Sequence, residues 1–206
     1  MVKEFNVLIT GVGGQGVILM SELLGNAAVK DGLKVRGSEI LGMAVRGGSV
    51  TSVIRFGDDV YGPLIPAGKC DVLIGMEPSE ALRNISCLSK TSIVIVNIAI
   101  TIPFTVSIGQ SSYPSLEDIF ANLFDASGGL IKLDAAGIAR EAGSLLTSNI
   151  VMLGALFGTE KMPIKTETMK AIIQHHFPAK TIPVNIKAFE LGYKASYKTV
   201  VQNIKL

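Results

Sequence analysis

Short apolar runs alternate with helix-like segments along this chain, and this alternation limits the fold more than any other feature. The runs lack the polar–apolar alternation of a strand with one wet face, so they are typical of a parallel sheet covered by helices on both sides. We therefore predict an α/β fold with a mainly parallel central sheet. The predicted strands are residues 6–10, 33–37, 49–56, 60–65, 70–76, 92–97 and 129–134.

Glycine, proline and charge divide the remaining segments. The turn at Gly57-Asp58-Asp59 predicts a hairpin, which makes the sheet mixed. Residues 38–48 predict a loop, with a short helix as an alternative. Residues 91–116 carry no charge but are rich in β-branched residues and split by Pro103, so we predict two buried extended stretches and no membrane helix. Helices are predicted at 15–30, 77–87, 116–124, 135–143, 148–158, 166–177 and 185–201.

Composition excludes several classes of protein. The chain has 206 residues, enough for one domain spanning 1–206. Its 48% hydrophobic and 17% charged residues predict a large core, an extensive subunit interface or both. A net charge of +2 without a lysine or arginine run argues against nucleic acid. With no signal peptide at the N-terminus, we expect a cytoplasmic protein that does not bind membranes.

Metal and catalytic chemistry have little support in the sequence. The two cysteines, Cys70 and Cys87, cannot supply the four thiolates of an iron–sulfur cluster and read as buried apolar residues. His175 and His176 are adjacent, so on a helix they diverge by about 100° and cannot hold one metal ion together. We predict no metal site and identify no catalytic residue.

A glycine turn follows the first predicted strand. Gly11, Gly13, Gly14, Gln15 and Gly16 lie between this strand and a helix, whose first N–H groups can bind a phosphate or carboxylate. An NAD site needs an acidic residue at the end of the second strand. The end of that strand has Arg36 and Ser38, and Glu39 lies one or two residues beyond the position where the acidic residue is needed. Arg36 could instead suit an NADP phosphate. The alternatives are another anionic ligand, a role facing a partner, or glycines needed only for turning and packing.

Two further groups of residues are candidates for the same site. Arg46, Gly47 and Gly48 form a loop whose guanidinium could hold phosphate or carboxylate in a bidentate way, or be a surface arginine beside a hinge. Glu77 and Asn97 each end a buried strand, at the edge where α/β proteins bind ligands. The alternative for Glu77 is a first-turn carboxylate favoured by the helix dipole. Asn97 leaves a similar choice between a site role and a structural one.

Several motifs together resemble a known family. They are GVGGQGVILMSELLGNAA, GSEILGMAVRGGSV and GPLIPAGKCDVLIGMEPSEALR, with NIKAFELGY near the tail. The chain resembles the gamma-type subunits of 2-oxoacid:ferredoxin oxidoreductases, most of all those of the indolepyruvate branch. The likeness is strong over residues 5–97 and weaker beyond. It implies a three-layer α/β/α fold, similar to a Rossmann domain but distinct from it.

The resemblance also implies a division of labour. The complete enzyme would oxidatively decarboxylate a 2-oxoacid, join the acyl group to coenzyme A and reduce ferredoxin. Thiamine diphosphate and the 4Fe-4S clusters would belong to a partner subunit, because this chain lacks the Gly-Asp-Gly and Asn-Asn motifs of a thiamine site. This chain would bind no cofactor alone, would contact coenzyme A at most, and would self-associate when isolated if its interface is left uncovered. A free-standing NAD(P)-binding oxidoreductase and a non-enzymatic adaptor are the alternatives.

Overall fold

The computed structural model describes residues 2–42 and 47–203, and in these residues six strands form one sheet in the order β2-β3-β1-β4-β5-β6. β3 runs antiparallel to both of its neighbours, whereas β1, β4, β5 and β6 pair in parallel. The sheet is therefore mostly parallel, as the apolar runs predicted, and it is mixed because of β3 and not because of the predicted Gly57 hairpin. The strands are β1 Phe5–Val12, β2 Val35–Leu41, β3 Ser49–Phe56, β4 Val72–Gly75, β5 Ile93–Asn97 and β6 Gly129–Leu133.

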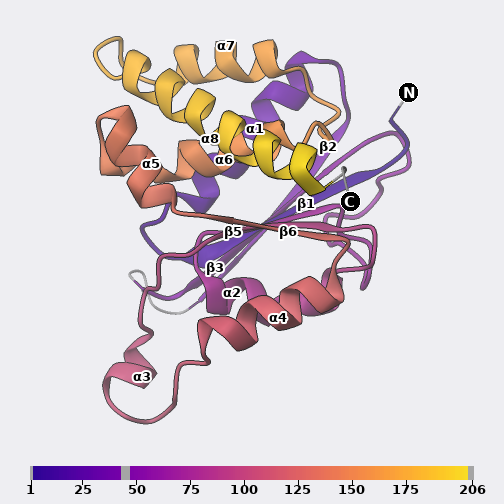
Figure 1. Cartoon of the computed structure of the whole chain (residues 1–206). Coiled ribbons are helices and arrows are strands. Elements are labelled where there is room, and N and C mark those ends of the chain that lie inside the picture. The colour runs from indigo at the N-terminus through magenta and orange to yellow at the C-terminus, as the bar shows by residue number, and fades with distance from the viewer. Residues whose placement is uncertain (1, 43–46, 204–206) are drawn as a thin grey trace.

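Helices cover both faces of this sheet (Figure 1). The upper layer in that view holds α1 Val17–Lys30, α5 Ala135–Ala142, α6 Ser148–Gly158, α7 Thr166–His176 and α8 Ile182–Asn203. The lower layer holds α2 Pro78–Arg83, the 3-10 helix η1 Ile85–Cys87 and α4 Leu116–Ala126, with α3 Phe104–Ser107 beyond its end. A second 3-10 helix, η2 Leu145–Thr147, leads into α6. Each face has its own apolar cluster, because both sides of the central strands are buried.

The first helix of the lower layer and α4 begin at side-chain caps. Glu77 caps α2, and Ser115 accepts a hydrogen bond from the Asp118 N–H at the start of α4. α4 begins at Leu116, as the sequence predicted, and ends two residues beyond the predicted boundary. Within the described residues, every helix is too short or too polar to cross a membrane.

The predicted hairpin at Gly57 is wrong. Residues 60–65 form no strand, and β3 instead forms a hairpin with β2, which continues to Leu41 through residues predicted as loop. The side chain of Arg55 explains the irregular segment, since its guanidinium donates hydrogen bonds to the carbonyl oxygens of Gly62 and Leu64 at 2.8 and 2.7 Å. These carbonyls are therefore satisfied by a buried side chain instead of a strand ladder.

The second of the two extended stretches predicted in residues 91–116 is also wrong. β5 occupies only part of the stretch before Pro103, since residues 98–103 form no strand, and the stretch after Pro103 begins with the helix α3. Ile100 and Ile102 are exposed. Apolar character alone therefore did not place this segment in the core.

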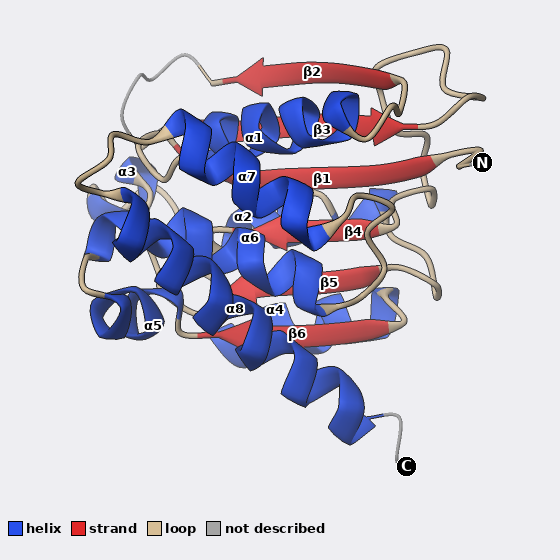
Figure 2. Cartoon of the chain, turned by 90° about the horizontal axis from the view of Figure 1, so that it is seen from above, coloured by secondary structure: helices blue, strands red, loops and turns tan. Residues whose placement is uncertain are grey.

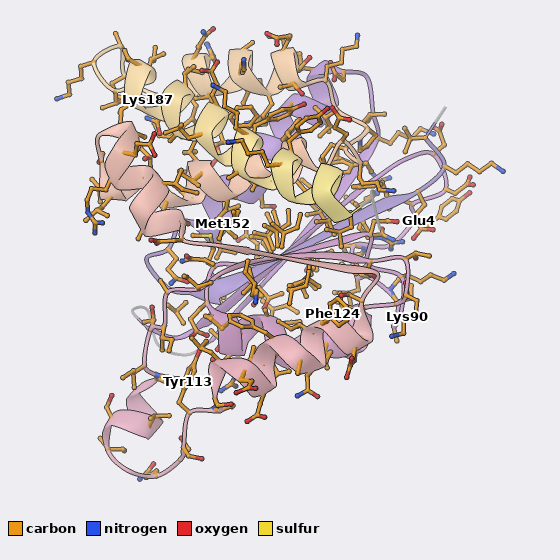
Figure 3. The ribbon with its side chains drawn as sticks, in the orientation of Figure 1. Glu4, Lys90, Tyr113, Phe124, Met152 and Lys187 are labelled. Carbon is orange, nitrogen blue, oxygen red and sulfur yellow. The ribbon has the colours of Figure 1, made fainter. Side chains whose placement is uncertain are left out.

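Helices α6 and α8 touch at backbone distance, which requires glycine on both. A Cβ added to Gly154 would lie 2.0 Å from the carbonyl oxygen of Phe189, and one added to Gly192 would lie 2.0 Å from that of Val151. Larger side chains would force the helix backbones apart. Met152, labelled in Figure 3, lies on the sheet side of α6 and is fully buried.

Candidate functional site

The glycine turn connects β1 to α1 at the edge where the parallel strands end (Figure 2). Gly14 and Gly16 have φ angles of 101° and 78°, which favour glycine. The Gln15 side chain closes the turn, because its Oε1 accepts the Val12 N–H at 2.9 Å while the Gln15 N–H returns to the Val12 carbonyl at 3.1 Å. Gln15 therefore shapes the turn through its own hydrogen bonds.

The glycines of the turn serve different purposes. A Cβ on Gly11 would lie 2.8 Å from the Cβ of Met76, and one on Gly16 would lie 2.4 Å from the Nδ2 of Asn149. These two positions fit the packing alternative. A Cβ on Gly14 would meet nothing within 4 Å, so the backbone there faces open space and can be approached from outside.

The second glycine loop reaches the first, although more than thirty residues separate them in sequence. The Gly13 N–H donates to the Gly48 carbonyl at 2.8 Å, and the Gly47 N–H donates to the Gly13 carbonyl at 3.5 Å. The β2–β3 hairpin brings this loop to the turn because β3 lies directly beside β1. Arg46 lies outside the described residues.

A cavity of about 490 Å³ opens between the glycine turn, with the start of α1, and residues at the end of β2 and the start of β3. The N-terminus of α1 points its first N–H groups at it, and neither a capping side chain nor an acidic residue occupies this first turn. The wall is otherwise apolar. Such a cavity can accept an anionic group through backbone N–H groups and an apolar group alongside. Its lining is Val12, Gly13, Gly14, Gly16, Val17, Ile18, Leu41, Gly42 and Val50.

Glu77 is fully buried and does not line this cavity. Its carboxylate accepts hydrogen bonds from the Ser79 hydroxyl at 2.6 Å, from the Glu80 N–H at 3.0 Å and from the Tyr113 hydroxyl. Burial and the Glu77 carboxylate together raise the pKa of Tyr113 well above its usual value. These contacts are those of a helix cap, which matches the alternative raised for this residue.

Asn97 is also buried and outside the cavity lining. Its Nδ2 donates to the Met76 carbonyl at 3.2 Å, and its Oδ1 accepts the Ala135 N–H at 3.2 Å. The side chain therefore ties the ends of β4 and β5 to the start of α5. This geometry supports the turn from behind and brings no polar atom of Asn97 to the cavity.

The order of the strands argues against a dinucleotide site. β3 separates β1 from β2, so the end of β2 is two strand spacings from the glycine turn, about 10 Å. Glu39 lies within β2, paired with Ser52. Arg36 pairs with Arg55 near the start of β2 and so lies at the opposite edge of the sheet from the turn. Neither residue is placed to hold a ribose or its phosphate.

Two residues that the sequence did not single out contact the turn. Gln15 Nε2 lies 3.3 Å from the Thr101 Oγ1, and Asn149 packs against Gly16. Thr101 lies in the segment after β5, and Asn149 is the second residue of α6. Tertiary packing brings both residues to the turn. The rule that parallel strands end at one edge of the sheet gave an indirect indication of Thr101, and nothing in the local sequence indicated Asn149.

Comparison with known proteins identifies the family. The model of the pyruvate ferredoxin/flavodoxin oxidoreductase family matches residues 6–195. This chain belongs to that family. It is 47% identical over 195 residues to the indolepyruvate oxidoreductase subunit IorB of Pyrococcus horikoshii, an alignment that covers 94% of this chain and 96% of that relative. The resemblance drawn from the glycine motifs is confirmed.

Solved structures of this family share the fold. The gamma subunit of a keto/oxoacid ferredoxin oxidoreductase from Geobacter sulfurreducens matches with a TM-score of 0.68 and 21% identity, over 94% of this chain and 99% of that one. A 2-oxoglutarate:ferredoxin oxidoreductase from Magnetococcus marinus, solved with 2-oxoglutarate, coenzyme A and succinyl-CoA bound, matches with a TM-score of 0.70 and 19% identity. That match covers 97% of this chain and 32% of the other. The predicted layered α/β fold is confirmed.

Proposed function

We propose that this chain is the gamma-type subunit of an indolepyruvate:ferredoxin oxidoreductase. The complete enzyme would oxidatively decarboxylate the 2-oxoacid, transfer the acyl group to coenzyme A and pass electrons to ferredoxin. The observation that carries the proposal is the 47% identity to an indolepyruvate oxidoreductase subunit over nearly the whole of both chains. Residues 1–206 would act as one domain of that assembly.

The redox chemistry is assigned to a partner subunit that holds thiamine diphosphate and 4Fe-4S clusters. Thiamine would stabilise the carbanion left by decarboxylation, and the clusters would carry the electrons. This chain's own thiols are poorly suited to holding a cluster, since Cys70 and Cys87 are both buried in the lower apolar cluster. Their number also falls short of the four thiolates that a cluster needs.

The role assigned to this chain is to receive an anionic part of coenzyme A. The geometry that supports it is the cavity between the glycine turn and the facing ends of β2 and β3, with uncapped N–H groups at the start of α1. The Gly47–Gly48 loop is hydrogen bonded to Gly13 of that turn. Backbone N–H groups near Gly14 and the guanidinium of Arg46 would contact the phosphates. Glu77 and Asn97 would contribute by fixing the strand ends behind the turn.

The test is coenzyme A dependence in the assembled enzyme. The chain is co-produced with its thiamine-containing partner, and indolepyruvate-dependent reduction of ferredoxin is measured against coenzyme A concentration. Arg46→Ala should raise the KM for coenzyme A roughly tenfold, the loss of one charge-assisted contact. Arg36→Ala is the matched control, because Arg36 lies on the same hairpin at the opposite edge of the sheet.

Three outcomes would count against the proposal. If no thiamine-containing protein assembles with the chain, the subunit assignment fails. If the complex forms and Arg46→Ala leaves both KM and turnover at the wild-type value, the coenzyme A role of this loop fails and the adaptor alternative gains. Micromolar binding of NADH or NADPH to the isolated chain would favour the free-standing oxidoreductase.

A further inference from the structure

The two cysteines of the chain are neighbours in the fold, although residues 71–86 separate them in the sequence. The Cys70 N–H donates a hydrogen bond to the Cys87 carbonyl oxygen at 3.0 Å. Both side chains are buried in the lower apolar cluster, and both are free thiols. The sequence predicted their burial but not their contact, which the fold creates by bringing the end of η1 beside the start of β4.

The backbone spacing of this pair suits a disulfide. Segments joined by a backbone hydrogen bond have their Cα atoms roughly 5–6 Å apart. Disulfides bridge Cα separations of about 4.4–6.8 Å. Because both side chains enter the same apolar cluster, they lie on the same side of the sheet. Joining the two sulfurs therefore needs rotation about side-chain bonds and little movement of the backbone.

The two thiols also affect each other's ionisation. The hydrogen bond with Cys70 lowers the pKa of Cys87, and the same contact, followed by burial, raises the pKa of Cys70. Because the thiolate is the nucleophile, Cys87 is suited to attack and Cys70 to resolve. The Cys70 thiol lies 3.2 Å from the Val72 carbonyl oxygen, a weak hydrogen bond that a disulfide would replace.

Small molecules can reach the pair in the folded chain. A cavity of about 550 Å³ has Cys70 in its lining and lies where β1, β4 and β5 begin, at the edge of the sheet opposite the glycine turn. Glu4 and Lys90 line the same cavity and appear on the right of Figure 3. Cys87 keeps 8% of its surface exposed, against 2% for Cys70, which again favours Cys87 as the first thiol to react.

We propose that Cys70 and Cys87 form a reversible disulfide within one chain when it meets a low-molecular-weight disulfide. The Cys87 thiolate attacks one sulfur of that disulfide, forms a mixed disulfide and releases a first small thiol, which takes up the proton that Cys87 lost. Cys70 then attacks the Cys87 sulfur, and the second small thiol leaves with the Cys70 proton. Two protein thiols are thereby oxidised to one disulfide, and the small disulfide is reduced to two thiols.

The new bond would close a ring that contains β4, Glu77 and α2. Such a ring restricts the unfolded chain, so the oxidised protein should be the more stable form. Met76 lies in this ring, packs against Gly11 and donates its N–H to the Thr10 carbonyl at 2.8 Å. Oxidation would therefore fasten the segment that supports the glycine turn from behind. This inference does not depend on the proposed function.

The experiment exposes the folded chain to glutathione disulfide without denaturant, followed by alkylation and mass spectrometry. The wild-type chain should become lighter by two hydrogen atoms and carry no glutathione. Trypsin should then release peptides 70–83 and 84–90 joined to each other. The Tm should rise by roughly 6–12 °C, and dithiothreitol should reverse both changes.

Two matched variants separate the roles of the thiols. Cys70→Ser keeps a hydroxyl that can donate to the Cys87 thiolate but lacks the resolving sulfur, so it should stop at a mixed disulfide between Cys87 and glutathione. Cys87→Ser should take up glutathione roughly tenfold more slowly or less, because its remaining thiol is the more buried one and has the higher pKa. Equal rates would overturn the assignment of Cys87 as the attacking thiol.

The measurements on the wild-type chain decide the proposal without relying on any variant to fold. It is overturned if the folded chain keeps both thiols, carries glutathione on both, or joins them only after urea is added. A joined pair whose Tm lies below that of the reduced chain would overturn it as well, because the bond would then distort the fold.

Discussion

Replacing glycine by alanine should change stability in opposite directions at two helical positions, one at the contact between α6 and α8 and one away from it. At Gly154 a methyl group would lie 2.0 Å from the Phe189 carbonyl oxygen and 2.8 Å from its carbon. At Gly25 in α1 the nearest atom is the Ile54 Cδ1 at 3.4 Å, an ordinary contact. Both positions are helical, so the gain in helix propensity is the same in both.

The magnitude follows from setting packing against propensity. Alanine gains about 1 kcal/mol over glycine in a helix interior. Overpacking a core costs roughly 1–3 kcal/mol, and the upper end applies at Gly154 because a backbone carbonyl cannot rotate away as a side chain can. We expect Gly154→Ala to lower the free energy of unfolding by about 2 kcal/mol, and Gly25→Ala to raise it by up to about 1 kcal/mol.

Thermal unfolding followed by circular dichroism measures both variants. In a chain of this size the Tm of Gly154→Ala should fall by roughly 4–8 °C and that of Gly25→Ala should rise by roughly 2–4 °C. Urea unfolding should show the change in midpoint with an unaltered slope. The reasoning is refuted if Gly154→Ala is as stable as Gly25→Ala, because the two helix backbones could not then be in contact at this position.

Two further predictions concern hydrogen bonds of carboxylates. Tyr113→Phe removes one of the donors to the buried Glu77 carboxylate and should lower the free energy of unfolding by roughly 1–3 kcal/mol, and an unchanged urea midpoint would contradict this. The hydrogen bond from Asn6, followed by that from Arg55, lowers the pKa of Glu4, so its contribution is present above the unfolded-state pKa and is lost as pH falls through the lower folded-state pKa. Glu4→Gln should therefore flatten the fall in stability below about pH 4.5, and an unchanged acid profile by urea titration would refute it.

The regular part of the fold was predictable because it depends on local pattern. β1, β4 and β5 are apolar runs that the sheet buries on both faces, and α1 and α4 begin at or near the predicted residues. The wrong predictions concern segments whose conformation is not determined by local composition. Residues 60–65 have strand-like composition, but the buried Arg55 binds two of their carbonyls. Residues 98–102 have the apolar composition of a core segment, yet they lie at the surface.

The location of the candidate site could be predicted from the sequence, but the contacts that its residues make could not. Strand ends of a parallel sheet meet at one edge, and this rule brought the glycine turn, Glu77 and Asn97 to the same end of the molecule. Which of these residues face outward depends on packing that local sequence does not encode. Gly16 is constrained by Asn149, more than a hundred residues later, and Glu77 is enclosed by Tyr113 from another element.

The position of β3 has a consequence for protein engineering. A designer who wished to turn this chain into a dinucleotide-dependent enzyme could not do so by placing an aspartate at the end of β2, since the antiparallel strand would still stand between that residue and the glycine turn. The whole β2–β3 arm would have to be removed or rethreaded. A glycine motif transferred to another sheet can therefore form a dinucleotide site only if the strand that supplies the ribose-binding residue lies next to it.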